Sequence, residues 1–87
     1  MSEKKKESLT ITDQKLLARI AARLKKLRIE KGFSNYEHFA NESGISRTQY
    51  GKYEVGENLK ILTLNKILRH LEVSLQEFFA EGFEDSI

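Results

Sequence analysis

Apolar residues recur every three or four positions along most of this chain, which is the spacing that gathers side chains on one face of an α-helix. In residues 13–31 this spacing joins Leu16, Ile20, Leu24 and Leu27, so we expect these four side chains to face a core. No stretch alternates apolar and polar residues beside a hairpin dipeptide, and the pattern therefore predicts no strand. The predicted fold class is all-α.

Helix-start signals divide the pattern into five helices. In a capping box, a Ser or Thr side chain binds the backbone three residues later, and a Glu or Gln at that position binds back. Three such pairs are present: Ser34 with Glu37, Ser46 with Gln49, and Ser74 with Glu77. Thr12 is expected to cap the first helix, and an apolar staple between Leu62 and Ile67 marks the start of the fourth. The predicted helices span residues 13–31, 35–42, 47–54, 64–71 and 75–81.

The carboxyl-terminal helices supply the other half of the expected core, in Ile67, Leu68, Leu71, Leu75, Phe78 and Phe79. Neighbouring residues on a helix point about 100° apart. Both phenylalanines can therefore be buried only if their helix is widely covered, and one of them is a candidate interface residue. In the first helix a basic row lies beside the apolar face, which we interpret as solvated rather than DNA-bound; its members are Lys15, Arg19, Arg23 and Lys26.

Length and composition narrow the class of protein. The chain has 87 residues, of which 39% are hydrophobic and none is cysteine or proline, and this suits one small helical domain rather than a disulfide scaffold. Residues 1–31 carry ten Lys or Arg against four acids, whereas residues 61–87 carry two against five. This asymmetry favours a polyanionic partner for the amino-terminal half. We expect residues 1–11 to be a flexible basic tail and residues 12–87 to be the domain.

No apolar run reaches the roughly 18 to 20 residues that a membrane span needs, and the lysine-rich start lacks the features of a secretory signal. We therefore expect a cytoplasmic protein without a membrane partner.

Two short predicted helices meet at a turn of three residues, 43–45. A turn of this length with one left-handed residue sets two helices at roughly 90 to 120°. Gly44 can adopt the left-handed conformation at little cost, and the small side chain of Ala40 lets the two backbones approach. The segment is therefore predicted to be a helix-turn-helix.

The second helix of this pair has two chemically different sides. If Tyr50 and Tyr53 pack inward with Ile45, the side that projects outward carries Arg47, Thr48 and Lys52. Arg can bind a guanine through two hydrogen bonds, Thr can contact a base edge or a thymine methyl group, and Lys can bind a base or a phosphate. Free N–H groups at the helix start suit a phosphate, and Gly51 leaves room for a nearby backbone.

With these residues in view, positions 16–82 resemble the helix-turn-helix transcriptional regulators related to lambda-type repressors and Cro, the XRE family. The matching segments are LKKLRIEKGFS, FANESGIS, QYGKYEVGE and LEVSLQEFFAEG. The resemblance implies a five-helix, lambda-repressor-like DNA-binding domain. It further implies that a dimer binds a specific sequence in double-stranded DNA and has a regulatory role without catalysis. We expect a homodimer that represses transcription and needs no cofactor.

The resemblance also implies roles for individual residues. Ser46 and Gln49 match positions that meet phosphates, and Arg47, Thr48 and Lys52 match positions that meet base edges. We add Asn35, Tyr36 and Lys60 to the residues expected to contact DNA. Arg28 and Glu54 match a partly buried ion pair that ties the first helix to the third. The chain departs from the family at Tyr36, where glutamine is usual, and at Tyr50, where an aliphatic residue is common.

Two other classes of function are an enzyme and a protein-interaction module. An enzyme finds no support, because the nucleophile, phosphate-loop, zinc and paired-carboxylate motifs are absent, and His38 and His70 lack a metal-ligand pattern. A protein-interaction module with the same fold, such as an antitoxin that binds a toxin, stays open. For the homodimer we expect a surface at the acidic carboxyl-terminal end, formed by Phe78, Phe79, Phe83 and Ile87.

Overall fold

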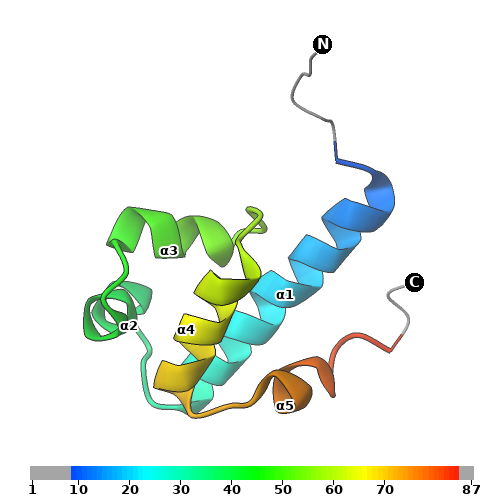
Figure 1. The fold of residues 1–87 in the computed structure, drawn as a ribbon. Helices are drawn as coiled ribbons and strands as arrows, with labels where there is room; N and C mark the ends of the chain where they lie inside the picture. Colours follow the sequence, from blue (N-terminus) through cyan, green and yellow to red (C-terminus); the bar gives the residue numbers. More distant parts are fainter. Residues whose placement is uncertain (1–8, 85–87) are drawn as a thin grey trace.

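A computed structural model of the chain describes residues 9–84, and the first eight and last three residues lie outside the described part. The described residues form α1 (Ile11–Glu30), α2 (Tyr36–Ser43), α3 (Arg47–Tyr53), α4 (Ile61–Leu71) and α5 (Leu75–Phe79), with no strand among them. In Figure 1 the long α1 runs diagonally behind α4, while α2 and α3 lie to one side of this pair and α5 lies below it. The predicted all-α, five-helix fold is confirmed.

The first helix begins earlier than predicted. Its cap is Thr10 rather than Thr12: the Thr10 hydroxyl accepts a hydrogen bond from the Asp13 backbone at 3.0 Å, and the Asp13 carboxylate accepts one from the Thr10 backbone at 3.2 Å. A cap at Thr12 would have placed Lys15 in the third position, where no side-chain oxygen can bind back. Ile11 is therefore helical, and only residues 1–8 of the predicted tail stay without a structural description.

Two further helix starts differ from prediction. Asn35 caps α2 in place of Ser34, because its side-chain oxygen accepts from the backbone N–H groups of Glu37 and His38, at 2.7 and 3.2 Å. Helix α4 begins at residue 61 rather than 64, without a side-chain cap. Leu62 is 77% exposed, so the predicted staple to Ile67 is wrong. Ser46 and Ser74 do cap α3 and α5 as predicted, the latter in a full capping box.

One core joins all five helices. The fully enclosed side chains include Leu24 of α1, Phe39 of α2, Tyr50 of α3, Ile67 of α4 and Phe78 of α5. In α1 the expected core position Leu16 is 38% exposed, which corrects the prediction. The buried stripe of that helix consists instead of Leu17, Ile20, Ala21, Leu24 and Arg28.

The two adjacent phenylalanines of α5 lie on different sides of the helix, as neighbouring helical residues must. Phe78 is fully buried, whereas Phe79 is 40% exposed. Phe78 therefore cannot belong to a dimer surface, contrary to our expectation, because the protomer already encloses it. Phe83 is half-buried against the core, and Ile87 lies outside the described residues.

Part of the basic row on α1 binds α5 instead of solvent. The Arg23 guanidinium donates to the backbone carbonyls of Glu77 and Phe78, each at 2.8 Å. Lys26 forms an ion pair with Glu81 just beyond α5, and this contact raises the pKa of Lys26 and lowers that of Glu81. Arg23 thus ties α1 to two carbonyls in the last turn of α5, of which that of Glu77 also accepts from the Ala80 backbone N–H.

We expect Arg23→Ala to lower the free energy of unfolding by about 1 to 3 kcal/mol, since two hydrogen bonds from a charged donor, one of them partly buried, are lost. Urea unfolding followed by circular dichroism measures the change. Lys15→Ala is the matched control, because Lys15 is an exposed cation of the same helix. Equal stability of the two variants would contradict the role assigned to Arg23.

Candidate nucleic-acid interface

The turn between α2 and α3 has the predicted left-handed glycine. Gly44 adopts φ 73° and ψ 28°, and its N–H donates back to the carbonyls of Ala40 and Asn41. Ala40 is fully buried, and its carbonyl also accepts from the Ile45 backbone at 3.0 Å. Lys66 of α4 donates to the Gly44 carbonyl at 3.4 Å. The backbone hydrogen bonds of the turn and the contact from Lys66 of α4 therefore both stabilise the angle between α2 and α3.

Helix α3 presents two distinct sides. Tyr50 and Tyr53 are buried, at 0% and 8% exposure, and α3 lies at the outer edge of the molecule in Figure 1. The Ser46 hydroxyl caps the helix by accepting from the Gln49 backbone at 3.0 Å. The exposed side chains of this segment are Ser46, Arg47, Thr48, Gln49 and Lys52. The predicted exposure of these residues is thus observed, while their contact with DNA stays a prediction.

The Arg28–Glu54 ion pair implied by the resemblance is present. The Arg28 guanidinium donates to both Glu54 carboxylate oxygens, at 2.7 and 3.0 Å, and its third nitrogen donates to the Phe33 carbonyl at 2.6 Å. The two side chains are only 4% and 8% exposed. The hydrogen bond to Glu54 raises the pKa of Arg28. Because Glu54 directly follows α3, the pair fixes the end of α3 against α1.

The Tyr50 hydroxyl is buried without a hydrogen-bond partner of acceptable geometry among the described residues. It lies in the electrostatic field of Arg28 and Glu54. Burial first, and then the Glu54 carboxylate, raise the pKa of Tyr50 well above its usual value, so the phenol stays neutral. A neutral ring suits a position that is commonly aliphatic in the family.

Tyr36, at the start of α2, packs against α3 rather than standing free. A Cβ atom built on Gly51 would lie 3.0 to 3.2 Å from the Tyr36 ring and hydroxyl, and the Tyr36 ring stacks on Tyr50 with centroids 6.4 Å apart. The space beside Gly51, which the sequence suggested for a partner backbone, is thus taken by the Tyr36 side chain of this protein. Tyr36 keeps 38% exposure at the surface.

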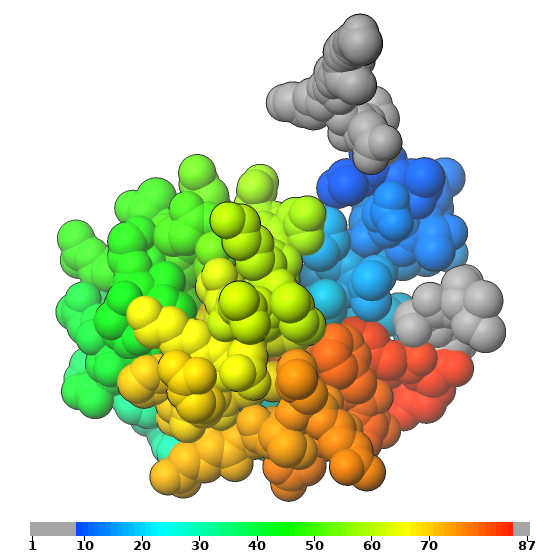
Figure 2. All heavy atoms as spheres, in the orientation of Figure 1, coloured from blue at the N-terminus to red at the C-terminus, as the bar shows by residue number. Residues whose placement is uncertain are grey.

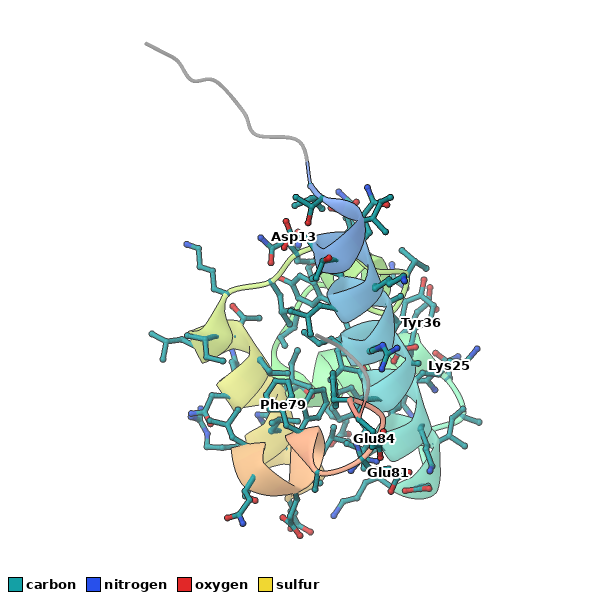
Figure 3. The ribbon with its side chains drawn as sticks, turned by 90° about the vertical axis from the view of Figure 1, so that its right-hand side faces the viewer. Asp13, Lys25, Tyr36, Phe79, Glu81 and Glu84 are labelled. Atoms are coloured by element: carbon teal, nitrogen blue, oxygen red, sulfur yellow. The ribbon has the colours of Figure 1, made fainter. Side chains whose placement is uncertain are left out.

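A depression of about 500 Å³ opens between α1 and α3. Its lining comprises Lys25, Arg28, Tyr36, Thr48, Gly51, Lys52, Glu54 and Val55. Arg28 and Glu54 neutralise each other, and neither Lys25 nor Lys52 forms an ion pair within residues 9–84. Figure 3 shows Lys25 and Tyr36 on the same side of the molecule. The depression thus carries two unpaired positive charges beside the exposed side of α3.

Lys25 was missed by the sequence reasoning. It stands three residues before Arg28 in the segment LKKLR, one helical turn away on a neighbouring face, and this spacing is the signal that could have identified it. The remaining predicted contact residues lie on other elements. Asn35 uses its side-chain oxygen to cap α2, and Lys60 is exposed at the start of α4.

Other kinds of site find no support in residues 9–84. No group of three or more His, Cys, Asp or Glu side chains in this range could hold a metal ion. Among the described helices, none combines the length and apolar composition that crossing a bilayer requires. The space-filling view in Figure 2 shows residues of α2 and α3 side by side on the visible surface.

Comparison with known proteins agrees with this geometry. A helix-turn-helix family model matches residues 24–78. The chain is also 43% identical, over 61 residues, to the SPbeta prophage-derived uncharacterized HTH-type transcriptional regulator YonR of Bacillus subtilis (strain 168), a match that covers 69% of this chain and 55% of that relative. No solved structure matches the chain significantly. The chain belongs to the XRE-type helix-turn-helix family of transcriptional regulators.

We expect Glu54→Ala to lower the free energy of unfolding by about 3 to 5 kcal/mol, because it leaves the Arg28 charge buried without its partner. Thermal unfolding measures the loss, with the exposed acid Glu57 replaced by Ala as the control. The double variant Arg28→Met, Glu54→Leu should recover much of the loss, since no charge is then buried. An unchanged melting temperature in Glu54→Ala would refute the structural role of the pair.

Proposed function

We propose that this protein is a sequence-specific transcriptional regulator that binds double-stranded DNA, acts as a repressor, and reads the major groove with α3. The observation that carries the proposal is that α3 has one buried and one exposed side: Tyr50 and Tyr53 are buried, whereas the exposed residues include Arg47, Thr48 and Lys52. A helix presented in this way from a helix-turn-helix fits the major groove of B-DNA. Occupying a promoter is sufficient for repression and needs no catalytic group.

Individual residues then have separable roles. Arg47 binds a guanine edge through two hydrogen bonds, Thr48 contacts a neighbouring base edge or a thymine methyl group, and Lys52 contacts a base or a phosphate. The residues assigned to phosphates are Asn35, Tyr36, Ser46, Gln49 and Lys60. The first group determines which sequence is bound, whereas the second contributes affinity for any duplex.

The depression beside α3 supports this assignment electrostatically. The ammonium groups of Lys25 and Lys52 come from different helices and line the same hollow. Phosphates neutralised by such cations release counterions, so binding weakens steeply as salt rises. Lys25 therefore joins the residues that hold the DNA backbone. DNA as the target also fits a cytoplasmic location.

A homodimer completes the proposal. One short helix reads only a few base pairs, so useful specificity asks for two half-sites about 34 Å apart. Phe79 lines an apolar hollow of about 270 Å³ together with Leu16, Ile61 and other residues of α1 and α4. These three side chains are 38 to 60% exposed. We assign this face to the second copy, with Phe83 beside it in place of the buried Phe78.

The same apolar face favours one alternative. A protein partner such as a toxin could cover it, in which case the chain would be an interaction module that keeps the fold. Apolar contact responds little to salt, whereas DNA binding falls steeply with it. Selecting duplexes from a random pool at two salt concentrations separates the two functions, because only the proposed regulator enriches one sequence with a strong salt dependence.

We expect Arg47→Ala to cost about 1 to 3 kcal/mol of binding to the selected site and to relax the preference at one base pair. Lys60→Ala and Lys25→Ala should instead weaken binding to all sequences alike and reduce the salt slope by about one each. Fluorescence anisotropy with the selected duplex and its single-base variants measures both effects. Equal losses on every sequence for all three variants would count against the division of roles.

We expect Phe79→Ser to shift the protein toward the monomer while its helical content is retained, because Phe79 is a partly exposed side chain of the assigned dimer face. Analytical ultracentrifugation with and without DNA gives the mass. Val55→Ser is the matched control, since Val55 is 80% exposed on another element. A wild-type protein that stays monomeric under both conditions would rule out the dimer.

A further inference from the structure

An acidic side chain stands beside the first residue of α3. The Glu37 carboxylate, in the first turn of α2, lies 4.0 Å from the Arg47 guanidinium, and the two side chains are 48% and 62% exposed. The backbone of Glu37 is fixed, since its N–H donates to the Asn35 side chain at 2.7 Å. The backbone of this acid is thus fixed on α2, and its carboxylate lies within ion-pair distance of the residue assigned to read a base.

This placement calls for an explanation, because a carboxylate close to DNA is repelled by phosphates. The nearby Glu54 is different, since Arg28 neutralises it inside the fold. Glu42, on the same helix as Glu37, faces His38 instead. Among the residues described, Arg47 is the cation that Glu37 faces.

We propose that Glu37 is a positioning residue for Arg47, which holds the guanidinium in the orientation that binds a guanine edge. The inference rests on the proposed function and deepens it. A guanidinium has five N–H donors in a fixed fork, and a guanine occupies two of them. An N–H on another edge stays available to the carboxylate, so Arg47 can serve both partners at once.

The expected consequence is sequence discrimination rather than affinity. Holding a long side chain in its bound conformation lowers the cost of ordering it on the correct base. On a DNA sequence that lacks the correct base, Arg47 turns toward a phosphate. The Glu37 carboxylate then stays close to the DNA without its partner and repels that phosphate, which weakens non-specific binding. Glu37 therefore penalises non-specific binding while it supports the specific contact.

The first test uses the free protein. We expect Glu37→Gln to make the Arg47 side chain more mobile, as measured by 15N relaxation of its Nε–H group. Glu42→Gln is the matched control, because it removes one negative charge from the same helix without facing Arg47. Glu37→Asp keeps the charge in the first turn of α2 but withdraws it by one methylene, so it separates loss of helix stability from loss of positioning. Unchanged Arg47 relaxation in Glu37→Gln would overturn the inference.

The second test uses the selected duplex and its variant at the base pair read by Arg47. We expect Glu37→Gln to reduce the ratio of the two affinities roughly two- to fivefold, which is the range for an exposed ion pair. Glu42→Gln should leave the ratio unchanged. In an Arg47→Ala background, Glu37→Gln should cause no further loss, because the residue it positions is gone.

The outcomes distinguish this inference from the proposed function. A wild-type protein that binds all DNA sequences equally would contradict both the proposed function and the role of Glu37. A wild-type protein with a clear preference, combined with equal ratios for Glu37→Gln and Glu42→Gln, overturns only the role of Glu37. If Glu37→Gln still lowers the affinity ratio in the Arg47→Ala background, the role of Glu37 is also overturned, because its effect must then act through another residue.

Discussion

The ion pair between Arg28 and Glu54 is the constraint on which the position of α3 depends. One guanidinium binds Glu54, directly after α3, and also the Phe33 carbonyl in the segment between α1 and α2. Three parts of the chain therefore converge on one buried charge. Because a buried charge is tolerated only with its partners in place, alternative positions of α3 are strongly disfavoured. The exposed side of α3 is oriented as a consequence of this interior contact.

The aromatic side chains extend the same constraint toward the surface. Phe33 packs edge-on against Phe39, and Phe39 against Tyr50, with centroids 5.2 and 5.3 Å apart. Tyr36 then stacks on the far side of Tyr50, over Gly51. The chain's two departures from the family, at Tyr36 and Tyr50, are thus parts of one packing arrangement. Gly51 belongs to it, since any larger residue there would displace the Tyr36 ring.

Much of this architecture could be predicted because its causes are local. The glycine turn, the caps of α3 and α5 and the inward tyrosines each follow from residues within one or two helical turns. The misplaced starts of α1 and α2 show the limit of such reasoning. Neighbouring candidates compete for each cap. Thr10 caps α1 in a full capping box with Asp13, whereas Asn35 caps α2 by accepting from two backbone N–H groups, without a side chain that binds back.

Other features have no local signal at all. Arg23 binds carbonyls more than 50 residues away in the chain, and a spacing pattern in α1 cannot indicate this. The burial of Leu17 in place of Leu16 is similar, because the face that α1 turns inward depends on contacts with elements distant in the sequence. The exposed residues of α3 were easier to predict than their surroundings, since Lys25, Tyr36 and Glu37 reach that face only through tertiary packing.

The proposed function requires that the exposed side of α3 bind duplex DNA. Titrating isotope-labelled protein with the selected duplex, while following the backbone and side-chain NMR signals, tests it most directly. The account predicts the largest shifts at residues 46–52, with smaller ones at Lys25 and Lys60 and none in the core around Leu24. Shifts confined to Leu16, Ile61 and Phe79 would contradict it, because the apolar face would then be the surface that the partner occupies.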